Sequence, residues 1–149
     1  MTKIRLTKRF TFEMAHALMG HDGLCKNIHG HSYVLWVTVI GEPSDENKDP
    51  KNGMVMDFSV LSKIVKSQIV EVFDHALVLN NKMPKNISDV FTDNFEKIIL
   101  VNYQPTCENL IKDFSQRLLS NNSDKVCLFS LKLQETETAF AEWFAQDNS

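Results

Sequence analysis

The sequence of 149 residues contains few of the residue types that mark specialised classes of protein. Its 5 glycines and 4 prolines are too few for a collagen-like or low-complexity chain. Its 3 cysteines are an odd number without a CxxC pair, which argues against a disulfide framework and favours reduced thiols. The remaining composition is that of an ordinary globular protein, and we expect residues 1–149 to form one domain with a single core.

Long hydrophobic stretches and an excess of basic charge are also missing. No run of about 18 apolar residues occurs, and the first nine residues alternate charged and apolar side chains, unlike the roughly 7 to 15 apolar residues of a signal peptide. The formal net charge of −3 provides no basic field for non-specific nucleic-acid binding. We therefore expect a cytoplasmic protein that binds neither membranes nor nucleic acids. An anionic substrate would need local basic residues.

Two stretches near the start of the chain alternate in the manner of half-buried β-strands. In residues 4–16, most apolar side chains take the even positions, and continuing this register places His16 on the apolar face. Residues 29–40 form the second predicted strand, in which His29 and His31 share a face because strand side chains alternate with a period of two. Antiparallel pairing would bring His16 beside them, since cross-strand neighbours lie roughly 5 Å apart.

The rest of the chain predicts two amphipathic helices and further extended segments. Apolar residues recur at helical spacing from residue 59 to about residue 74, and a second helix begins at Thr106, a suitable N-cap residue. The predicted extended segments are residues 53–57, 97–101 and 125–136. The resulting order, β-β-β-α-short element-α-β, predicts an α+β domain in which two helices cover one face of an antiparallel sheet.

The last predicted strand ends in a carboxylate. Its alternation places Cys127, Phe129, Leu131 and Leu133 on one face and carries Glu135 to the end of that face. Glu135 could be the solvated end of the strand, or it could hold a paired set of donors on a heterocycle.

Three histidines, His16, His29 and His31, form the strongest candidate site because strand register brings them to one end of the sheet. A HxH pair alone is most often not a metal site, but His16 adds a third imidazole. Three His without a Cys ligand matches catalytic zinc, which keeps one position open for water or substrate. Fe²⁺ or another divalent ion is the alternative, since imidazole discriminates weakly among them. We expect His21, in the connecting loop, to be solvated.

Cys25 admits two interpretations. Alone it could be a small hydrophobe, which is how we interpret Cys107 and Cys127. It lies four residues before His29 in a glycine-containing loop, and a divalent cation nearby would lower its pKa and make it a base or nucleophile. A role as a fourth metal ligand is the less favoured alternative.

The predicted first helix ends at a carboxylate followed by an imidazole. Asp74 and His75 could simply be favourable partners of the helix dipole. They could also form a proton relay that works near neutral pH.

Six motifs follow one another between residues 10 and 137. They are Phe12-x-Met-Ala-His16, Cys25-x3-His29-Gly-His31-x-Tyr33, Gly53-Met-Val-Met-Asp57-Phe58, Phe73-Asp74-His75-x3-Leu79-Asn80, Pro105-Thr106-x-Glu108-Asn109 and Gln134-Glu135-Thr136. In this order they resemble the motifs of the 6-pyruvoyl-tetrahydropterin synthase / 6-carboxy-tetrahydropterin synthase family. The three residues between Cys25 and His29 are similar to the bacterial 6-carboxy-tetrahydropterin synthases of the queuosine pathway, whereas biopterin-pathway enzymes tend to have a longer gap.

The resemblance implies a tunnelling fold (T-fold), with a four-stranded antiparallel sheet and two helices on one side. It also implies a homo-hexamer, in which three subunits close their sheets into a barrel and two such trimers stack. Such an assembly would protect the open edges of a small sheet. The implied residue roles are Zn²⁺ binding by His16, His29 and His31, catalysis by Cys25, Asp74 and His75, and pterin binding by Glu135, Thr106 and Glu108.

The activity that the resemblance implies is a lyase reaction. It converts 7,8-dihydroneopterin triphosphate into 6-carboxy-5,6,7,8-tetrahydropterin and releases acetaldehyde and triphosphate. Lys26 is a candidate for contact with the triphosphate because it adjoins Cys25. One alternative is 6-pyruvoyl-tetrahydropterin synthase activity, which eliminates triphosphate and keeps all side-chain carbons. A remote alternative is a non-catalytic pterin- or metal-binding protein on the same fold.

Overall fold

The computed structural model describes residues 2–149. Its strands are β1 (Ile4–His16), β2 (His29–Gly41), β3 (Ala76–Asn80), β4 (Ile98–Val101), β5 (Val126–Thr136) and β6 (Ala139–Phe144). Its helical segments are η1 (Leu24–Lys26), α1 (Phe58–Val65), η2 (Lys66–Val70), α2 (Glu71–Phe73), α3 (Lys85–Asn94), α4 (Cys107–Leu119) and η3 (Ala145–Asn148). The predicted α+β class is confirmed.

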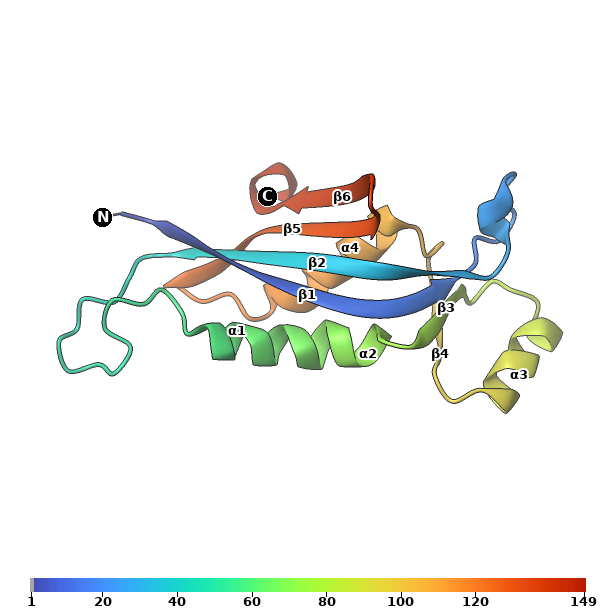
Figure 1. Ribbon diagram of the computed structural model, residues 1–149, viewed down its shortest axis with the longest axis horizontal. Coiled ribbons are helices and arrows are strands. Elements are labelled where there is room, and N and C mark those ends of the chain that lie inside the picture. Colours follow the sequence, from blue (N-terminus) through green and yellow to red (C-terminus); the bar gives the residue numbers. More distant parts are fainter. Residues whose placement is uncertain (1) are drawn as a thin grey trace.

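All six strands form one sheet in the order β4-β3-β1-β2-β5-β6 (Figure 1). β2 pairs antiparallel with β1 and β5, and β6 pairs antiparallel with β5. β3 pairs parallel with β1, because the α1–α2 helical run reverses the chain between β2 and β3. β3 also pairs parallel with β4, because the segment that contains α3 connects the two strands. The prediction of a four-stranded antiparallel sheet is therefore wrong, since the sheet has six strands and is mixed.

Residues 53–57 form turns and a bend instead of the predicted strand. Val55 and Met56 pack against the core from this irregular segment, so their apolar character reflects burial without strand pairing. Asp57 then caps α1, because its side chain accepts a hydrogen bond from the backbone N–H of Ser59 at 2.8 Å.

Both predicted amphipathic helices are confirmed. α1, η2 and α2 form one continuous helical run from Phe58 to Phe73, with a π-helical turn in its middle. Asp74 ends this run in an extended conformation. α4 begins after Thr106, whose side-chain oxygen accepts a hydrogen bond from the backbone N–H of Asn109 at 3.3 Å.

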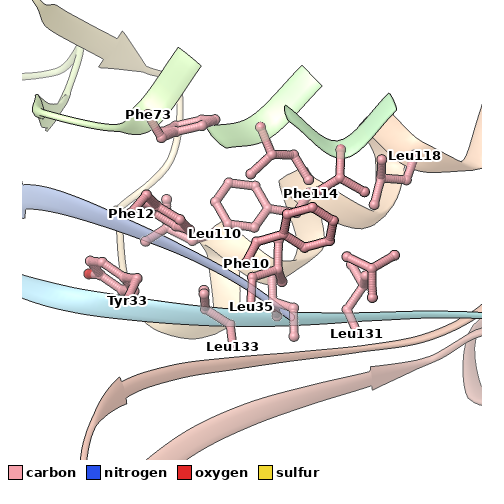
Figure 2. Close-up of a cluster of buried hydrophobic side chains, with 14 of the residues drawn as sticks. Phe10, Phe12, Tyr33, Leu35, Phe73, Leu110, Phe114, Leu118, Leu131 and Leu133 are labelled. Carbon is pink, nitrogen blue, oxygen red and sulfur yellow. The ribbon is translucent and has the colours of Figure 1, made fainter. Parts of the chain in front are cut away.

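The two helical runs cover the same face of the sheet, and the core lies between them and the strands (Figure 2). The sheet contributes Phe10, Phe12, Tyr33, Leu35, Leu131 and Leu133, and the helices contribute Phe73, Leu110, Phe114 and Leu118. The buried face of β1 continues to the end of that strand at His16. The core therefore runs directly into the candidate site.

A β-bulge in β5 changes which side chains face this core. Leu128 pairs with Val39 and Ser130 pairs with Thr38, so Phe129 has no partner on β2. As a result, Leu128 faces the core before the bulge and Leu131 faces it after. The predicted placement of Cys127 and Phe129 on one face with Leu131 and Leu133 is wrong, because the extra residue reverses the alternation.

The segment between β3 and α4 contains a short helix and a strand. α3 lies at one end of the molecule, away from the two long helices (Figure 1). β4 confirms the strand predicted over residues 97–101. Among residues 2–149, no helix is both long and apolar enough to cross a membrane.

Candidate metal centre and active site

The antiparallel pairing of β1 with β2 brings three imidazoles together. His16 pairs directly with His29, and Met14 pairs with His31, so the three histidines share one face at one end of the sheet. The ring centroids of His16 and His29 are 4.6 Å apart, and the ring of His31 lies 5.0 Å and 5.2 Å from those of His29 and His16. One nitrogen of each residue lies within 4.8 Å of the others, which confirms the predicted convergence.

Backbone carbonyl groups fix the tautomers of two of these histidines. Nδ1 of His16 lies 2.7 Å from the carbonyl oxygen of Pro105, and Nδ1 of His29 lies 2.7 Å from that of Asn27. A carbonyl oxygen only accepts hydrogen bonds, so both Nδ1 atoms carry the proton and both Nε2 atoms keep a lone pair. These Nε2 atoms are 3.0 Å apart. Two facing lone pairs at this distance suit a shared cation, and the donor set fits a metal ion.

Burial keeps the imidazoles in the form that binds metal. Desolvation lowers the pKa of His16 and of His31 below the ordinary value of 6.5, and the neighbouring imidazoles lower it further. The hydrogen bond to the Pro105 carbonyl group raises the pKa of His16, and Glu135 raises the pKa of both residues, but neither overcomes the effect of burial. Neutral histidine is the metal-binding form, so the pKa shifts favour metal binding near neutral pH.

Glu135 lies against the histidine cluster. Its Oε1 atom is 3.5 Å from Nε2 of His16 and 3.7 Å from Nε2 of His31. The hydroxyl of Tyr33 donates a hydrogen bond to the same Oε1 atom at 3.0 Å. Burial and the nearby carboxylate raise the pKa of Tyr33, so the phenol remains a donor. Glu135 is therefore not simply the solvated end of the strand, because its carboxylate contacts two histidines and Tyr33.

Tyr33 is a site residue that was not predicted from the sequence, although its position two residues after His31 could have indicated it. Tyr33 follows His31 by two residues in a strand, which places both side chains on the same face. Its side chain is fully buried, and its ring stacks on Phe12 with centroids 5.2 Å apart. A buried phenol requires a partner for its hydroxyl, and Glu135 supplies it.

Asp74 and His75 form a hydrogen-bonded pair outside this cluster. Oδ2 of Asp74 lies 2.9 Å from Nδ1 of His75. The backbone N–H of Glu13 donates to Oδ1 of Asp74 at 2.8 Å, and the backbone N–H of His75 donates to the carbonyl oxygen of Glu13 at 2.6 Å. The bond from the backbone N–H of Glu13 is the main cause that lowers the pKa of Asp74.

His75 lines a shallow hollow of about 340 Å³, and His31 of the histidine cluster lines it as well. The hollow is lined in part by Glu13, Ala15 and Ser32. In β1, Glu13 and Ala15 alternate with buried residues, so their side chains lie on the sheet face opposite to the helices. Within residues 2–149, the structure records no hydrogen bond between the Asp74–His75 pair and the three clustered histidines.

The three cysteines have different surroundings. Cys25 is exposed in η1, and its carbonyl oxygen accepts a hydrogen bond from the backbone N–H of Leu18 at 3.0 Å. Cys107 is half-buried with its thiol 3.4 Å from the carbonyl oxygen of Leu133, and burial raises its pKa to about 12. Cys127 is also half-buried. Exposure therefore distinguishes Cys25, as predicted, from the other two thiols.

The start of α4 supports the cluster through its backbone. Thr106 caps the helix, and the adjacent Pro105 supplies the carbonyl group that binds His16. Glu108 is exposed in the first turn of α4. The structure therefore places Thr106 beside the histidine site and leaves the side chain of Glu108 in solvent.

Two predicted loop residues lie at the surface. His21 is exposed, and its Nδ1 accepts a hydrogen bond from the backbone N–H of Gly23 at 2.8 Å, in agreement with the expectation of a solvated side chain. Lys26 is exposed in η1 beside Cys25.

Comparison with proteins of known sequence gives one consistent family. Residues 5–146 match the family described as 6-pyruvoyl tetrahydropterin synthase. The chain is 35% identical over 141 residues to the 6-carboxy-5,6,7,8-tetrahydropterin synthase of Haemophilus influenzae, covering 93% of this chain and 97% of that protein. It is 30% identical over 141 residues to the 6-carboxy-5,6,7,8-tetrahydropterin synthase of Rickettsia bellii, covering 93% of this chain and 99% of that protein.

Solved structures agree on the fold. A protein from Wolinella succinogenes superimposes with a TM-score of 0.78 at 19% identity, covering 97% of this chain and 99% of the other. The 6-pyruvoyl tetrahydropterin synthase of Caenorhabditis elegans superimposes with a TM-score of 0.68 at 24% identity, covering 97% of both chains. The predicted T-fold is therefore confirmed. Because the family match spans nearly the whole chain and two relatives reach 30% identity or more, this chain belongs to the 6-pyruvoyl tetrahydropterin synthase family.

Proposed function

We propose that this lyase-type enzyme converts 7,8-dihydroneopterin triphosphate into 6-carboxy-5,6,7,8-tetrahydropterin in a zinc-dependent reaction that releases acetaldehyde and triphosphate. The observation that carries the proposal is the convergence of His16, His29 and His31 beside Glu135. The relatives named 6-carboxy-5,6,7,8-tetrahydropterin synthase, at 30% to 35% identity, support the carboxy product. The corresponding pathway is queuosine (7-deazaguanine) biosynthesis. The three free cysteines suit a reducing compartment such as the cytoplasm.

His16, His29 and His31 would hold the zinc ion. When bound there, Zn²⁺ would supply a Lewis acid that acidifies the side-chain hydroxyls of the substrate. The protonated Nδ1 atoms of His16 and His29 donate hydrogen bonds to backbone carbonyl groups, which directs both Nε2 atoms toward the metal position. The remaining Nε2 lone pairs are then available as donors. Elemental analysis of the purified protein distinguishes zinc from iron and other divalent ions.

Three side chains would move protons during the reaction. Cys25 is the exposed thiol, and as a thiolate it would take a proton from the substrate side chain. Asp74 accepts the Nδ1 proton of His75, which leaves Nε2 of His75 to exchange protons with the substrate. Together with the addition of one water molecule, these transfers would allow internal redox, loss of triphosphate and cleavage of the carbon–carbon bond to give the carboxyl group and acetaldehyde.

Glu135 would orient the pterin ring. A carboxylate can accept two N–H bonds from a 2-amino-4-oxo heterocycle, and the bond from Tyr33 fixes the carboxylate beside the histidines. Thr106 and Glu108 would build part of the same pocket from the start of α4. Lys26, exposed beside Cys25, is a candidate for contact with the triphosphate.

We also propose that residues 1–149 act as one domain within a homo-hexamer, a dimer of trimers. The sheet of one chain has two free edges, β4 and β6. Closure of three sheets into a barrel would pair such edges. Sedimentation of the purified protein measures the assembly directly.

Product analysis tests the proposed activity. The purified protein is incubated with 7,8-dihydroneopterin triphosphate, with and without a chelator, and the products are identified by mass spectrometry. We expect the carboxylated pterin and one equivalent of acetaldehyde, both lost after chelation and restored by zinc. Cys25→Ala should prevent product formation while metal content remains unchanged.

The rival activity is 6-pyruvoyl tetrahydropterin synthesis, which the description of the matching family favours. A pyruvoyl product without acetaldehyde would establish it and overturn our proposal. Substrate binding without turnover would instead identify a non-catalytic pterin-binding protein.

A further inference from the structure

A lysine from outside the helix binds the carbonyl groups at the end of α2. Nζ of Lys97 donates to the carbonyl oxygen of Glu71 at 2.8 Å and also to the carbonyl oxygen of Asp74. The last carbonyl groups of a helix have no partners inside it and carry partial negative charge, so a cation at this position satisfies and stabilises them. Lys97 therefore binds both the helix terminus and the backbone of a proposed catalytic residue.

The main chain of Lys97 is itself fixed to the sheet. Its carbonyl oxygen accepts a hydrogen bond from the backbone N–H of Leu77 in β3 at 3.0 Å. Residues 98–101 continue as β4 along the same strand. The main chain of Lys97 is thus bonded to β3 just before β4 begins, and its side chain extends to residues that precede β3.

The Asp74–His75 pair is supported on its other side by β1. Glu13 donates its backbone N–H to the Asp74 carboxylate and accepts the backbone N–H of His75 at its carbonyl oxygen, at 2.8 Å and 2.6 Å. The pair therefore has two supports, the main chain of Glu13 and the side-chain ammonium of Lys97.

The conformation of His75 requires such support. Its φ angle of 61° is left-handed, a region that residues other than glycine rarely adopt unless the surroundings determine it. The side chains of Asp74 and His75 are 37% and 78% exposed, so apolar packing cannot hold them. The recorded contacts of the pair are polar ones to Glu13 and Lys97, while the flanking Phe73 and Ala76 are buried in the core.

We propose that Lys97 is a positioning residue for the Asp74–His75 pair. It fixes the carbonyl group of Asp74, and this sets the direction in which His75 presents its imidazole. The inference rests on the proposed function, in which this pair moves protons. Lys97 itself takes no part in the chemistry.

The test compares Lys97→Met, which removes the ammonium, with Lys97→Arg, which keeps a cationic donor. We expect Lys97→Met to lower kcat about tenfold with little change in KM. A misplacement of about 1 Å can lower the rate on the order of 100-fold, and the loss of one of two supports should displace the pair by less than that. Lys97→Arg should restore most of kcat. Lys66→Met, at an exposed lysine in η2, serves as the control and should behave like the wild type.

A second readout does not depend on turnover. Hydrogen exchange of peptides covering residues 70–77 should accelerate in Lys97→Met, because the amides of Asp74 and His75 lose their fixed geometry. Exchange in β2 and β5 and the metal content should remain unchanged. The urea midpoint of unfolding is measured for each variant to identify general destabilisation.

Several outcomes would overturn the inference. Wild-type kcat and exchange in Lys97→Met would do so, and so would a loss of activity that Lys97→Arg fails to restore or that accompanies metal loss. His75→Ala distinguishes the proposed role of the Asp74–His75 pair from the proposed role of Lys97. If it leaves turnover intact, the proposed role of the pair is wrong. If it stops turnover while Lys97→Met leaves kcat and exchange unchanged, only the role of Lys97 is wrong.

Discussion

The histidine cluster and the Asp74–His75 pair are held in place by different means. The side chain of His16 is only 3% exposed, and its position follows from strand register and from one bond to a carbonyl group. His75 is 78% exposed, and its position depends on backbone contacts made by distant residues. Side chains on paired strands are fixed by the sheet itself. A residue that follows a helix needs support from elsewhere in the chain, so the two regions should respond differently to substitution.

Removal of one imidazole should have the largest effect and should be confined to the cluster. We expect His29→Ala to weaken metal binding on the order of 100-fold or more, since loss of an outer-shell partner alone costs about 10- to 100-fold. Turnover should disappear with the metal. Mass spectrometry of bound metal provides the measurement, and His21→Ala, at an exposed loop histidine, is the control. Full metal content in His29→Ala would contradict the assignment of the ligand.

Substitution in the pair should separate catalysis from metal binding. His75→Ala should lower kcat about 100- to 10,000-fold, the range typical of a general acid or base, with metal content unchanged. Steady-state kinetics and elemental analysis of the same preparation give both quantities. Loss of metal in this variant would show that the two regions are not independent.

Tyr33→Phe examines the contact that holds Glu135 beside the cluster. A hydrogen bond to a charged group contributes about 1.5 to 3 kcal/mol, and we expect KM for the pterin substrate to rise about tenfold with metal retained. Tyr103→Phe is a matched control, because its hydroxyl donates to Asp113 at 2.6 Å. That variant should lose stability without a change in KM. Equal effects of the two variants on KM would refute a specific role for Tyr33.

The cap of α4 should contribute mainly to stability. Thr106→Ala removes the side-chain acceptor for the N–H of Asn109 and should lower the free energy of unfolding by about 1 kcal/mol. Thr106→Ser keeps the acceptor and should be close to wild type in urea denaturation. A small loss of metal affinity is also expected, because the adjacent Pro105 carbonyl group orients His16.

The pH dependence of the metal-free protein should show the smallest effect. Burial lowers the pKa of His16 and His31 below 6.5 in the folded state, so below that pH the unfolded chain binds protons that the folded chain does not. The free energy of unfolding should therefore fall as the pH is lowered from 7 to 5. The fall should be weaker in His16→Gln, and an identical slope in the variant would exclude the buried imidazole as its cause.

The features that could be predicted from the sequence are those set by local periodicity. Period-two alternation in two long strands placed His16 opposite His29, and helical spacing with Thr106 as N-cap located α4. The parallel strand β3 and the edge strand β6 were not predicted. Segments of four to six residues have no dependable period, so the prediction of β4 was right while that of residues 53–57 was wrong. The contacts of Glu13 and Lys97 with Asp74 were not predictable either, since they join residues 61 and 23 positions apart.

The bulge at Phe129 makes the number of residues in β5 as important as their identity. Leu128 lies on the core face before it, and Leu131 and Leu133 lie on that face after it, which brings Glu135 to the side of the histidines. A substitution at Phe129 preserves this spacing. Deletion of the residue shifts the strand by one position, so that either Leu128 or the residues from Leu131 to Glu135 turn away from the core. We therefore expect this position to tolerate exchange of side chains but not a change in chain length.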